Sequence, residues 1–320
     1  MWKFAPILKT TIWGGENIVR IKNIRPAISE VGESWEISSV PENISVVEAG
    51  PDKGLTLKEL LEKYGSDLLG ERNYKKYGDR FPLLVKLIDT AEDLSVQVHP
   101  DDQVATEMGY PNGKTEMWYV MHAGKNARIA NGFRRPVEPE EYENLVSSGK
   151  IEDILNYEGI KTGDVYYIPA GRVHAICKDC TMVEIQQTSD ATFRIYDYNR
   201  KDKNGNLREL HTDLARRAIN FKDTEGKASD YNLRAGVPVN VIKSPYFSIN
   251  ILEADNPLMR DYSESDTFVV ITMVEGAAAI RCGGESTTVS KGHSVLIPAS
   301  ATGIEIDPDK NVRLLEAYIS

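Results

Sequence analysis

At 320 residues the chain is long enough to bury a large core and to form two domains. Hydrophobic residues make up 41% and charged residues 27% of the sequence, a balance typical of a globular protein. The formal net charge of −10 argues against nucleic acid or an anionic membrane as the main partner. No apolar stretch is long enough to span a bilayer. The odd cysteine count and an N-terminus without a signal-peptide core predict a cytoplasmic protein without disulfides.

Most of the sequence alternates between apolar and polar residues with a period of two, which predicts β-strands. Three segments show helical spacing instead, at residues 57–77, 138–155 and 213–220. The predicted strands, in chain order, are residues 83–88, 94–99, 117–121, 165–168, 181–186 and 193–198. The pattern therefore favours a mainly β protein with helices inserted in its first half.

Two parts of the sequence resemble each other. Residues 163–174 and 292–303 both read as a glycine turn, an alternating strand, Ile-Pro-Ala and a second turn. Upstream, residues 118–124 resemble residues 270–276 in the same relative order. A duplication explains both similarities, and chance likeness between two β-hairpins is the alternative because short turn motifs recur.

The duplication predicts two β-barrel units. The first, residues 1–233, is enlarged by helical insertions at about residues 56–78 and 138–158, and the second is residues 234–320. We expect the chemistry to lie in the first unit.

Two histidines and a glutamate on separate predicted strands form a candidate metal site. In the strand that ends at His99, the side chain of Gln97 points to the same face as His99, and aliphatic residues fill the other face. Glu116 stands at the start of another strand, and His174 begins a third. Two imidazoles and a carboxylate leave coordination positions for water or substrate, and Gln97 could add a neutral oxygen ligand. Because Gly303 stands where the first unit has His174, the second barrel is expected to lack a metal.

Each histidine also has a plain alternative, since a lone histidine in a strand is usually a satisfied polar residue. This alternative is preferred for His122, His211 and His293. The position of His99 on a polar strand face and of His174 after a Gly-Pro-Gly turn favours a metal for these two.

The same segments carry a family resemblance. The pattern Gly163-x5-Pro169-x-Gly171-x2-His174 resembles a conserved motif of the cupin superfamily. Residues 94–102, residues 113–116 and the run from His174 to Arg194 look like the compact bacterial type I mannose-6-phosphate isomerases. The resemblance implies a fold of two cupin-like jelly-roll barrels and one zinc ion per chain, held by Gln97, His99, Glu116 and His174. It also implies that Arg194 is the active-site arginine and that Lys114 contacts substrate.

The implied reaction interconverts mannose 6-phosphate and fructose 6-phosphate through an enediolate. Zinc can polarise the carbonyl, and Arg194 can stabilise the developing negative oxygen. Glu184 is the candidate proton carrier, or a group that supports one. A structural ion pair between Glu184 and Arg194 is the alternative.

The phosphate group of such a substrate requires cations and hydrogen-bond donors. Lys114 is the first candidate, with the Ser95 hydroxyl as a donor. Lys86 and Arg134 are further candidates, although Lys86 lies in an apolar strand and could simply extend its ammonium group to water.

The motif Cys177-x-x-Cys180 lies between two predicted strands. A second zinc site or redox control would fit the motif, but a hairpin turn is favoured because zinc normally requires two more nearby ligands.

Two other classes of function use the same metal ligands. A cupin dioxygenase would hold iron there, and a sugar-binding protein would keep the metal without turnover. The presence of Glu184, Arg194 and Lys114 favours the isomerase. The expected partner is a small sugar phosphate, with the chain acting as a monomer or small homo-oligomer.

Overall fold

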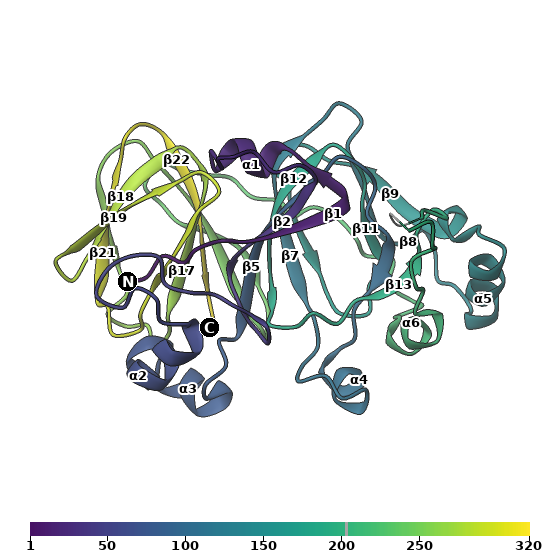
Figure 1. Cartoon of the computed structure of the whole chain (residues 1–320), viewed down its shortest axis with the longest axis horizontal. Coiled ribbons are helices and arrows are strands. Elements are labelled where there is room, and N and C mark those ends of the chain that lie inside the picture. The colour runs from purple at the N-terminus through teal and green to yellow at the C-terminus, as the bar shows by residue number, and fades with distance from the viewer. Residues whose placement is uncertain (202–203) are drawn as a thin grey trace.

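The computed structural model describes residues 1–201 and 204–320. Strands dominate the chain and form four main antiparallel sheets, two in each half (Figure 1). A two-stranded ribbon adds β3 (Ser39–Val40) and β4 (Asn43–Ile44). In the described part of the chain, no helix combines the length and the apolar character needed to cross a membrane.

The first half contains a six-stranded and a five-stranded sheet. The six-stranded sheet has the order β1 (Ile7–Gly15), β2 (Val31–Ile37), β5 (Leu83–Thr90), β12 (Cys180–Gln187), β7 (Glu116–Ala123) and β10 (Val165–Ile168). The five-stranded sheet has the order β13 (Phe193–Tyr196), β6 (Val96–Val98), β11 (His174–Ile176), β8 (Arg128–Phe133) and β9 (Leu155–Gly159). Buried residues from both sheets, such as Trp118 and Ile176, share one core, so the sheets face each other.

The second half repeats this plan with five and four strands. Its larger sheet has the order β14 (Val239–Lys243), β15 (Ser248–Ala254), β22 (Val312–Tyr318), β17 (Val269–Glu275) and β20 (Ser294–Ile297). The smaller one has the order β16 (Leu258–Asp261), β21 (Gly303–Pro308), β18 (Ala277–Cys282) and β19 (Glu285–Ser290). The order β5-β12-β7-β10 matches β15-β22-β17-β20, and β6-β11-β8-β9 matches β16-β21-β18-β19.

The expectation of barrels needs correction. Each sheet has two edge strands, so the strands form open, facing sheets and do not close into barrels. A sequence pattern of alternating strands is the same for both arrangements, because only the pairing of the outermost strands distinguishes them.

The repeat is also shifted by one residue from the sequence comparison. Val120 exchanges backbone hydrogen bonds with the Gly163 turn in the same way that Met273 does with the Gly292 turn. Trp118 therefore corresponds to Ile271 and not to Val270. Alternation could not fix this register, because strands β7 and β17 bury both of their faces.

The two halves share a core. The outward faces of β5, β12 and β7 pack on the large sheet of the second half, where Val85, Val183 and Met117 belong to the same buried cluster as Ile249 and Leu315. The outward faces of the large sheets are therefore covered by apolar side chains. Figure 1 shows the two halves side by side.

We predict from this packing that Leu315→Ala destabilises the whole chain. Leu315 is fully buried, and such a truncation costs about 2–5 kcal/mol in free energy of unfolding. Chemical denaturation measures the effect. Met259→Ala, at a side chain that is 70% exposed, should change the free energy of unfolding by no more than about 0.5 kcal/mol. Equal effects of the two variants would contradict a shared core.

The predicted helices form with changed limits. Residues 57–77 form α2 (Leu57–Leu69), which begins with a capping box between Thr56 and Glu59, and α3 (Glu71–Tyr77). Gly70, with φ of 89°, separates them. The segment predicted at 138–155 forms α5 (Pro139–Ser147) and a 3₁₀ turn (Ile151–Ile154) before β9, and residues 213–220 contribute to α6 (Thr212–Ala218).

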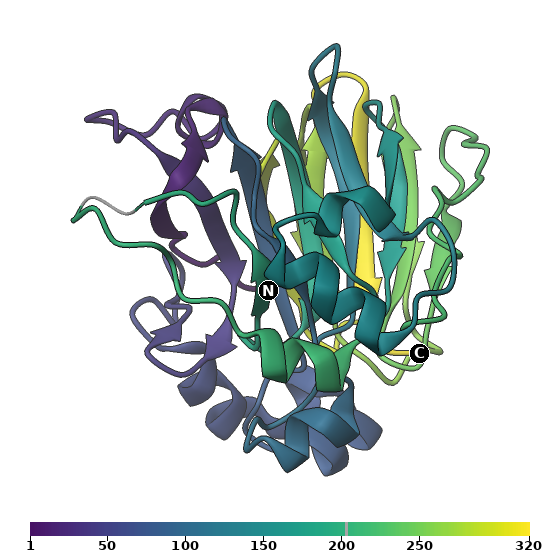
Figure 2. The ribbon, with the colours of Figure 1, turned by 90° about the vertical axis from the view of Figure 1, so that its right-hand side faces the viewer.

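Two short helices were not predicted, α1 (Asn17–Ile21) and α4 (Asp102–Glu107). Helix α4 begins at Asp101, whose carboxylate accepts a hydrogen bond from the backbone N–H of Val104 at 2.8 Å. In Figure 1, α2, α3 and α4 lie at the lower edge, α5 and α6 at the right and α1 at the top. Helices α5 and α6 cover the outer face of the five-stranded sheet, in front of the strands in Figure 2. They leave the inner face of that sheet to the polar site described next.

Candidate metal centre

Three side chains from facing sheets converge inside the first half. Glu116 begins β7 of the six-stranded sheet, His99 directly follows β6, and His174 begins β11 of the facing sheet. Their potential ligand atoms all lie within 4.8 Å of one another, and each side chain is at most 1% exposed. The structure thus brings together the three residues on which the predicted metal site depends.

Backbone carbonyls orient both imidazoles. His99 Nδ1 lies 2.9 Å from the carbonyl oxygen of Ala191, and His174 Nδ1 lies 2.9 Å from that of Arg172. Each Nδ1 therefore donates, and each Nε2 presents its lone pair toward Glu116, at 3.3 Å for His99 and 3.5 Å for His174. His174 Nε2 and Glu116 Oε1 have no hydrogen-bond partner among the described residues. Buried acceptors without donors are the feature expected of residues that fit a metal ion.

Lys114 lies in the same cluster. Its Nζ is 2.8 Å from His99 Nε2 and 2.7 Å from Glu116 Oε2, and the side chain is only 4% exposed. The ammonium group thus provides a positive charge beside a buried carboxylate. The family resemblance implied that Lys114 contacts substrate, and in the structure it lies among the candidate ligand atoms.

The charges of the cluster suit metal binding. Burial, followed by the charge of Lys114, lowers the pKa of His99 to about 3, and burial also lowers the pKa of His174. Burial alone would raise the pKa of Glu116, but Lys114 and the two histidines outweigh it and hold this pKa well below its usual range. Two neutral imidazoles and one carboxylate are the ionisation states in which these residues coordinate a metal.

Gln97 and Arg194 lie beside this cluster. In the five-stranded sheet Gln97 is paired with His174 on one side and with Arg194 on the other. Val96 and Val98 point to the outer core, so Gln97 points to the inner face. Arg194 donates from Nη1 to the carbonyl of Glu209 at 2.6 Å, and its buried Nε has no partner among the described residues.

Glu184 is held by a different cation from the one considered in the sequence. Its Oε1 lies 2.8 Å from Lys86 Nζ, and its Oε2 accepts a hydrogen bond from Trp118 Nε1 at 3.0 Å. The Trp118 ring in turn contacts the His174 ring edge-on, with centroids 5.4 Å apart. The alternative of an ion pair between Glu184 and Arg194 is therefore wrong, because the cation paired with Glu184 is Lys86.

The remaining candidates for the phosphate differ in their burial and in their partners. Lys86 is buried and tied to Glu184, and Arg134 is exposed and donates to the carbonyl of Leu155. Ser95 is buried directly before β6. Lys86 therefore does not extend to water, and Arg134 lies on the surface.

Comparison with known proteins agrees with this geometry. The family model described as phosphomannose isomerase type I, catalytic domain, matches residues 1–115, and the one described as mannose-6-phosphate isomerase, cupin domain, matches residues 239–314. The mannose-6-phosphate isomerase ManA of Bacillus subtilis is 34% identical over 299 residues, 92% of each protein. The mannose-6-phosphate isomerase of Streptococcus mutans is 30% identical over 302 residues, 94% of this chain and 93% of the relative.

The chain belongs to the type I mannose-6-phosphate isomerase family. It is accordingly an isomerase. The crystal structure of mannose 6-phosphate isomerase from Bacillus subtilis superimposes with a TM-score of 0.88 at 34% identity, covering 99% of this chain and 98% of that one. A variant of phosphomannose isomerase from Salmonella typhimurium, at 16% identity and a TM-score of 0.82, shares the fold.

Several polar residues near the candidate site were not identified as site residues from the sequence. Asp197 is surrounded by Arg200 and Arg208, and all three lie near Arg194 in the chain or in space. Burial first, and then repulsion by Arg194 and Arg200, lowers the pKa of Arg208. Gln186 is another such residue, and the alternation Met182-Glu184-Gln186 along β12 could have indicated that it faces inward.

The Cys177 and Cys180 thiols are free and buried in the turn between β11 and β12. Burial raises the pKa of each to about 12, so neither is a reactive thiolate. Among the described residues, the His99 cluster is the one group of histidine, cysteine or acidic side chains arranged to hold a metal. The motif is thus part of a turn, but the prediction of a hairpin is wrong, because β11 and β12 belong to facing sheets and are not paired with each other.

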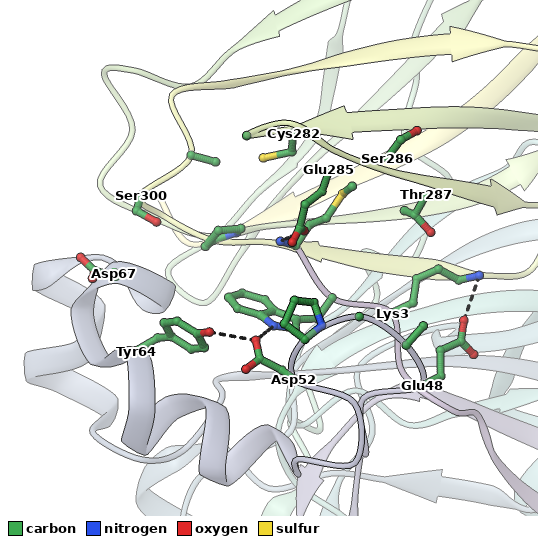
Figure 3. Close-up of a pocket in the computed structure, with 18 residues that line it drawn as sticks. Lys3, Glu48, Asp52, Tyr64, Asp67, Cys282, Glu285, Ser286, Thr287 and Ser300 are labelled. Carbon is green, nitrogen blue, oxygen red and sulfur yellow. Dashed lines mark hydrogen bonds and ion pairs between the residues drawn. The ribbon is translucent and has the colours of Figure 1, made fainter.

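A cavity of about 750 Å³ lies away from the metal centre (Figure 3). It is bounded by the N-terminal segment, helix α2 and the hairpin of β18 and β19, with Asp52 accepting hydrogen bonds from Trp2 and Tyr64 in its wall. The carboxylates of Glu48, Asp52, Asp67 and Glu285 line it. Three of these carboxylates are paired with cations, Glu48 with Lys3, Asp52 with Lys63 and Glu285 with the N-terminal ammonium group, and none of the clustered residues of the metal centre lines the cavity.

Proposed function

We propose that this chain is a zinc-dependent aldose–ketose isomerase that interconverts mannose 6-phosphate and fructose 6-phosphate. The convergence of His99, Glu116 and His174, with buried acceptors that lack donors, is the observation that carries the proposal. Gln97 is the proposed fourth ligand, since it lies on the same inner face opposite His174. Bound zinc would supply a Lewis acid that polarises the sugar carbonyl.

The chain's own residues would position the sugar and move the protons. Conversion of the aldose to the ketose takes a proton from C2 and returns one to C1, while the O2 proton passes to O1 by way of an enediolate. Arg194 would stabilise negative charge on the sugar oxygens, because its guanidinium is permanently charged and has a free Nε–H. Glu184 is the proposed proton carrier.

The environment of Glu184 bears on that role. Burial would lower the pKa of Lys86, but Glu184 and Glu33 outweigh it and raise this pKa above its ordinary value. Lys86 therefore stays protonated, and its ammonium group lies 2.8 Å from the Glu184 carboxylate.

Positive charge at the site supports an anionic substrate although the chain as a whole is acidic. Three guanidinium groups, from Arg194, Arg200 and Arg208, lie near the carboxylates of Asp197 and Glu209, and guanidinium groups bind phosphate bidentately. Lys114 and Ser95, which lie on the side of the metal centre, are two further residues proposed to contact the substrate.

We further infer that the two sheet pairs are two cupin jelly-roll units, residues 1–233 and 234–320, that arose by duplication. The matching strand orders support this division. At the positions of Glu116 and Trp118 the second unit has Val269 and Ile271, so it offers no carboxylate there. The free cysteines support a cytoplasmic location.

A coupled assay on mannose 6-phosphate tests substrate, reaction and metal together. Protein stripped with a chelator should be inactive, and added zinc should restore formation of fructose 6-phosphate. Oxygen uptake should be absent with either zinc or iron. A chelated enzyme with full activity would contradict the metal, and a zinc-loaded enzyme that binds the sugar without turnover would contradict the isomerase.

A further inference from the structure

Gln186 is a buried amide next to the candidate metal ligands. It lies near the end of β12, has no exposed surface, and is paired directly with Glu116 on β7. Side chains alternate along a strand, so Gln186 shares the inner face with Glu184. A buried amide at this place requires hydrogen-bond partners.

Both amide hydrogens of Gln186 are used by one turn. Nε2 lies 2.9 Å from the carbonyl oxygen of Gln187 and 2.7 Å from that of Ser189. Two carbonyl acceptors fix the amide orientation, because a flipped group would place its oxygen against them. The Oε1 atom has no partner among the described residues, so the amide acts on its surroundings through its two N–H bonds.

This turn holds two parts of the metal centre. The hydroxyl of Ser189 accepts a hydrogen bond from the backbone N–H of Ala191 at 3.3 Å, and the Ala191 carbonyl accepts the Nδ1–H of His99 at 2.9 Å. On the other side, the side-chain oxygen of Gln187 accepts the backbone N–H of Thr115, the residue before Glu116, at 2.9 Å. Ser189, Ala191 and Thr115 are all buried, so water does not substitute for these bonds.

We propose that Gln186 is a positioning residue of the metal centre. Its amide holds residues 187–191 in the conformation in which the Ala191 carbonyl directs His99 Nε2 toward the ion. The proposal rests on the metal centre proposed above. It predicts that loss of the two N–H bonds weakens metal binding, because a partner that orients a ligating histidine typically contributes 10–100-fold in affinity.

The test compares Gln186→Met with a matched variant, Asn73→Leu. Methionine keeps the length of the side chain and removes both donors. Asn73 is also a buried amide that donates two hydrogen bonds, to the Leu69 carbonyl and the Thr267 hydroxyl, but it lies in α3. Zinc affinity of each full-length protein is measured by competition with a chromophoric chelator, alongside the visible spectrum of the cobalt-substituted form and metal-free thermal unfolding.

We expect Gln186→Met to bind zinc about 10–100-fold more weakly and to show an altered cobalt spectrum. Asn73→Leu should lower the unfolding temperature and leave zinc affinity and the spectrum unchanged.

Unchanged zinc affinity in Gln186→Met, or an equal loss of zinc affinity in Asn73→Leu, would overturn the proposal. If Gln186→Met does not fold, Ser189→Ala decides it by the same criteria, because it removes the hydroxyl that accepts from Ala191 N–H and donates to the Asn112 carbonyl. A wild-type chain that binds no zinc contradicts the metal centre itself, whereas wild-type binding with an unaffected variant contradicts only the role of Gln186.

Discussion

Replacing His174 with alanine is expected to abolish both zinc binding and isomerase activity. The variant retains only His99 and Glu116 of the clustered ligands, and Lys114 already contacts both of them. Lewis-acid catalysis by a metal is worth several kcal/mol, so kcat should fall by about 10²–10⁴-fold. Metal analysis after gel filtration, together with the coupled assay, measures the two effects.

The control for this variant is His122→Ala, at an exposed histidine on the same strand as Glu116. It should bind one zinc ion per chain and retain full activity. Because His174 is buried, circular dichroism of His174→Ala must first show a folded protein. A folded His174→Ala with wild-type zinc content would contradict the proposed ligand set.

Arg194→Ala is expected to keep the metal and lose turnover. The side chain lies on the inner face of the sheet, two strands from His174, with its Nε free to donate to substrate. Removal of one donor that stabilises a developing oxyanion costs about 10²–10³ in kcat. Zinc content should remain one ion per chain, which separates this effect from that of His174→Ala.

One further variant tests whether geometry or charge matters at position 194, and a second serves as a control elsewhere. Arg194→Lys keeps the positive charge without the planar fork, and should recover only part of the activity. Arg216→Ala, on the exposed side of α6 where Arg216 pairs with Glu143, should behave as wild type. Near-normal kcat in Arg194→Ala would exclude the proposed role of the guanidinium. Loss of zinc from the same variant would show instead that Arg194 supports the ligands.

The strand positions and faces of the candidate ligands could be predicted from local patterns. Alternation along one strand placed Gln97 and His99 on one polar face, and the turns before Glu116 and His174 placed each at the start of a strand. These are properties of neighbouring residues in the chain, which the backbone geometry of a strand determines directly. The helix at residues 57–77 was predicted for the same reason, although its break at Gly70 depends on a left-handed backbone conformation.

The partners of these residues were decided only by tertiary structure. Glu184 pairs with Lys86 and not with Arg194, because β12 lies beside β5 in one sheet while β13 belongs to the facing sheet. The alternation of apolar and polar residues along a strand predicts which face a side chain occupies. It contains no information on which other strand lies next to that strand in the sheet. The same limit concealed the one-residue shift between the two halves.

Gln186 shows the difference most clearly. Its inward direction follows from the sequence, since it is two residues from Glu184 in an alternating strand. Its connection to His99 follows from a turn folded back on residues distant in the chain, with each hydrogen bond buried. The sequence by itself determined which side chains face the interior of the first half. The packing of two sheets, which brings strands far apart in the chain within hydrogen-bond distance, decided what those side chains contact.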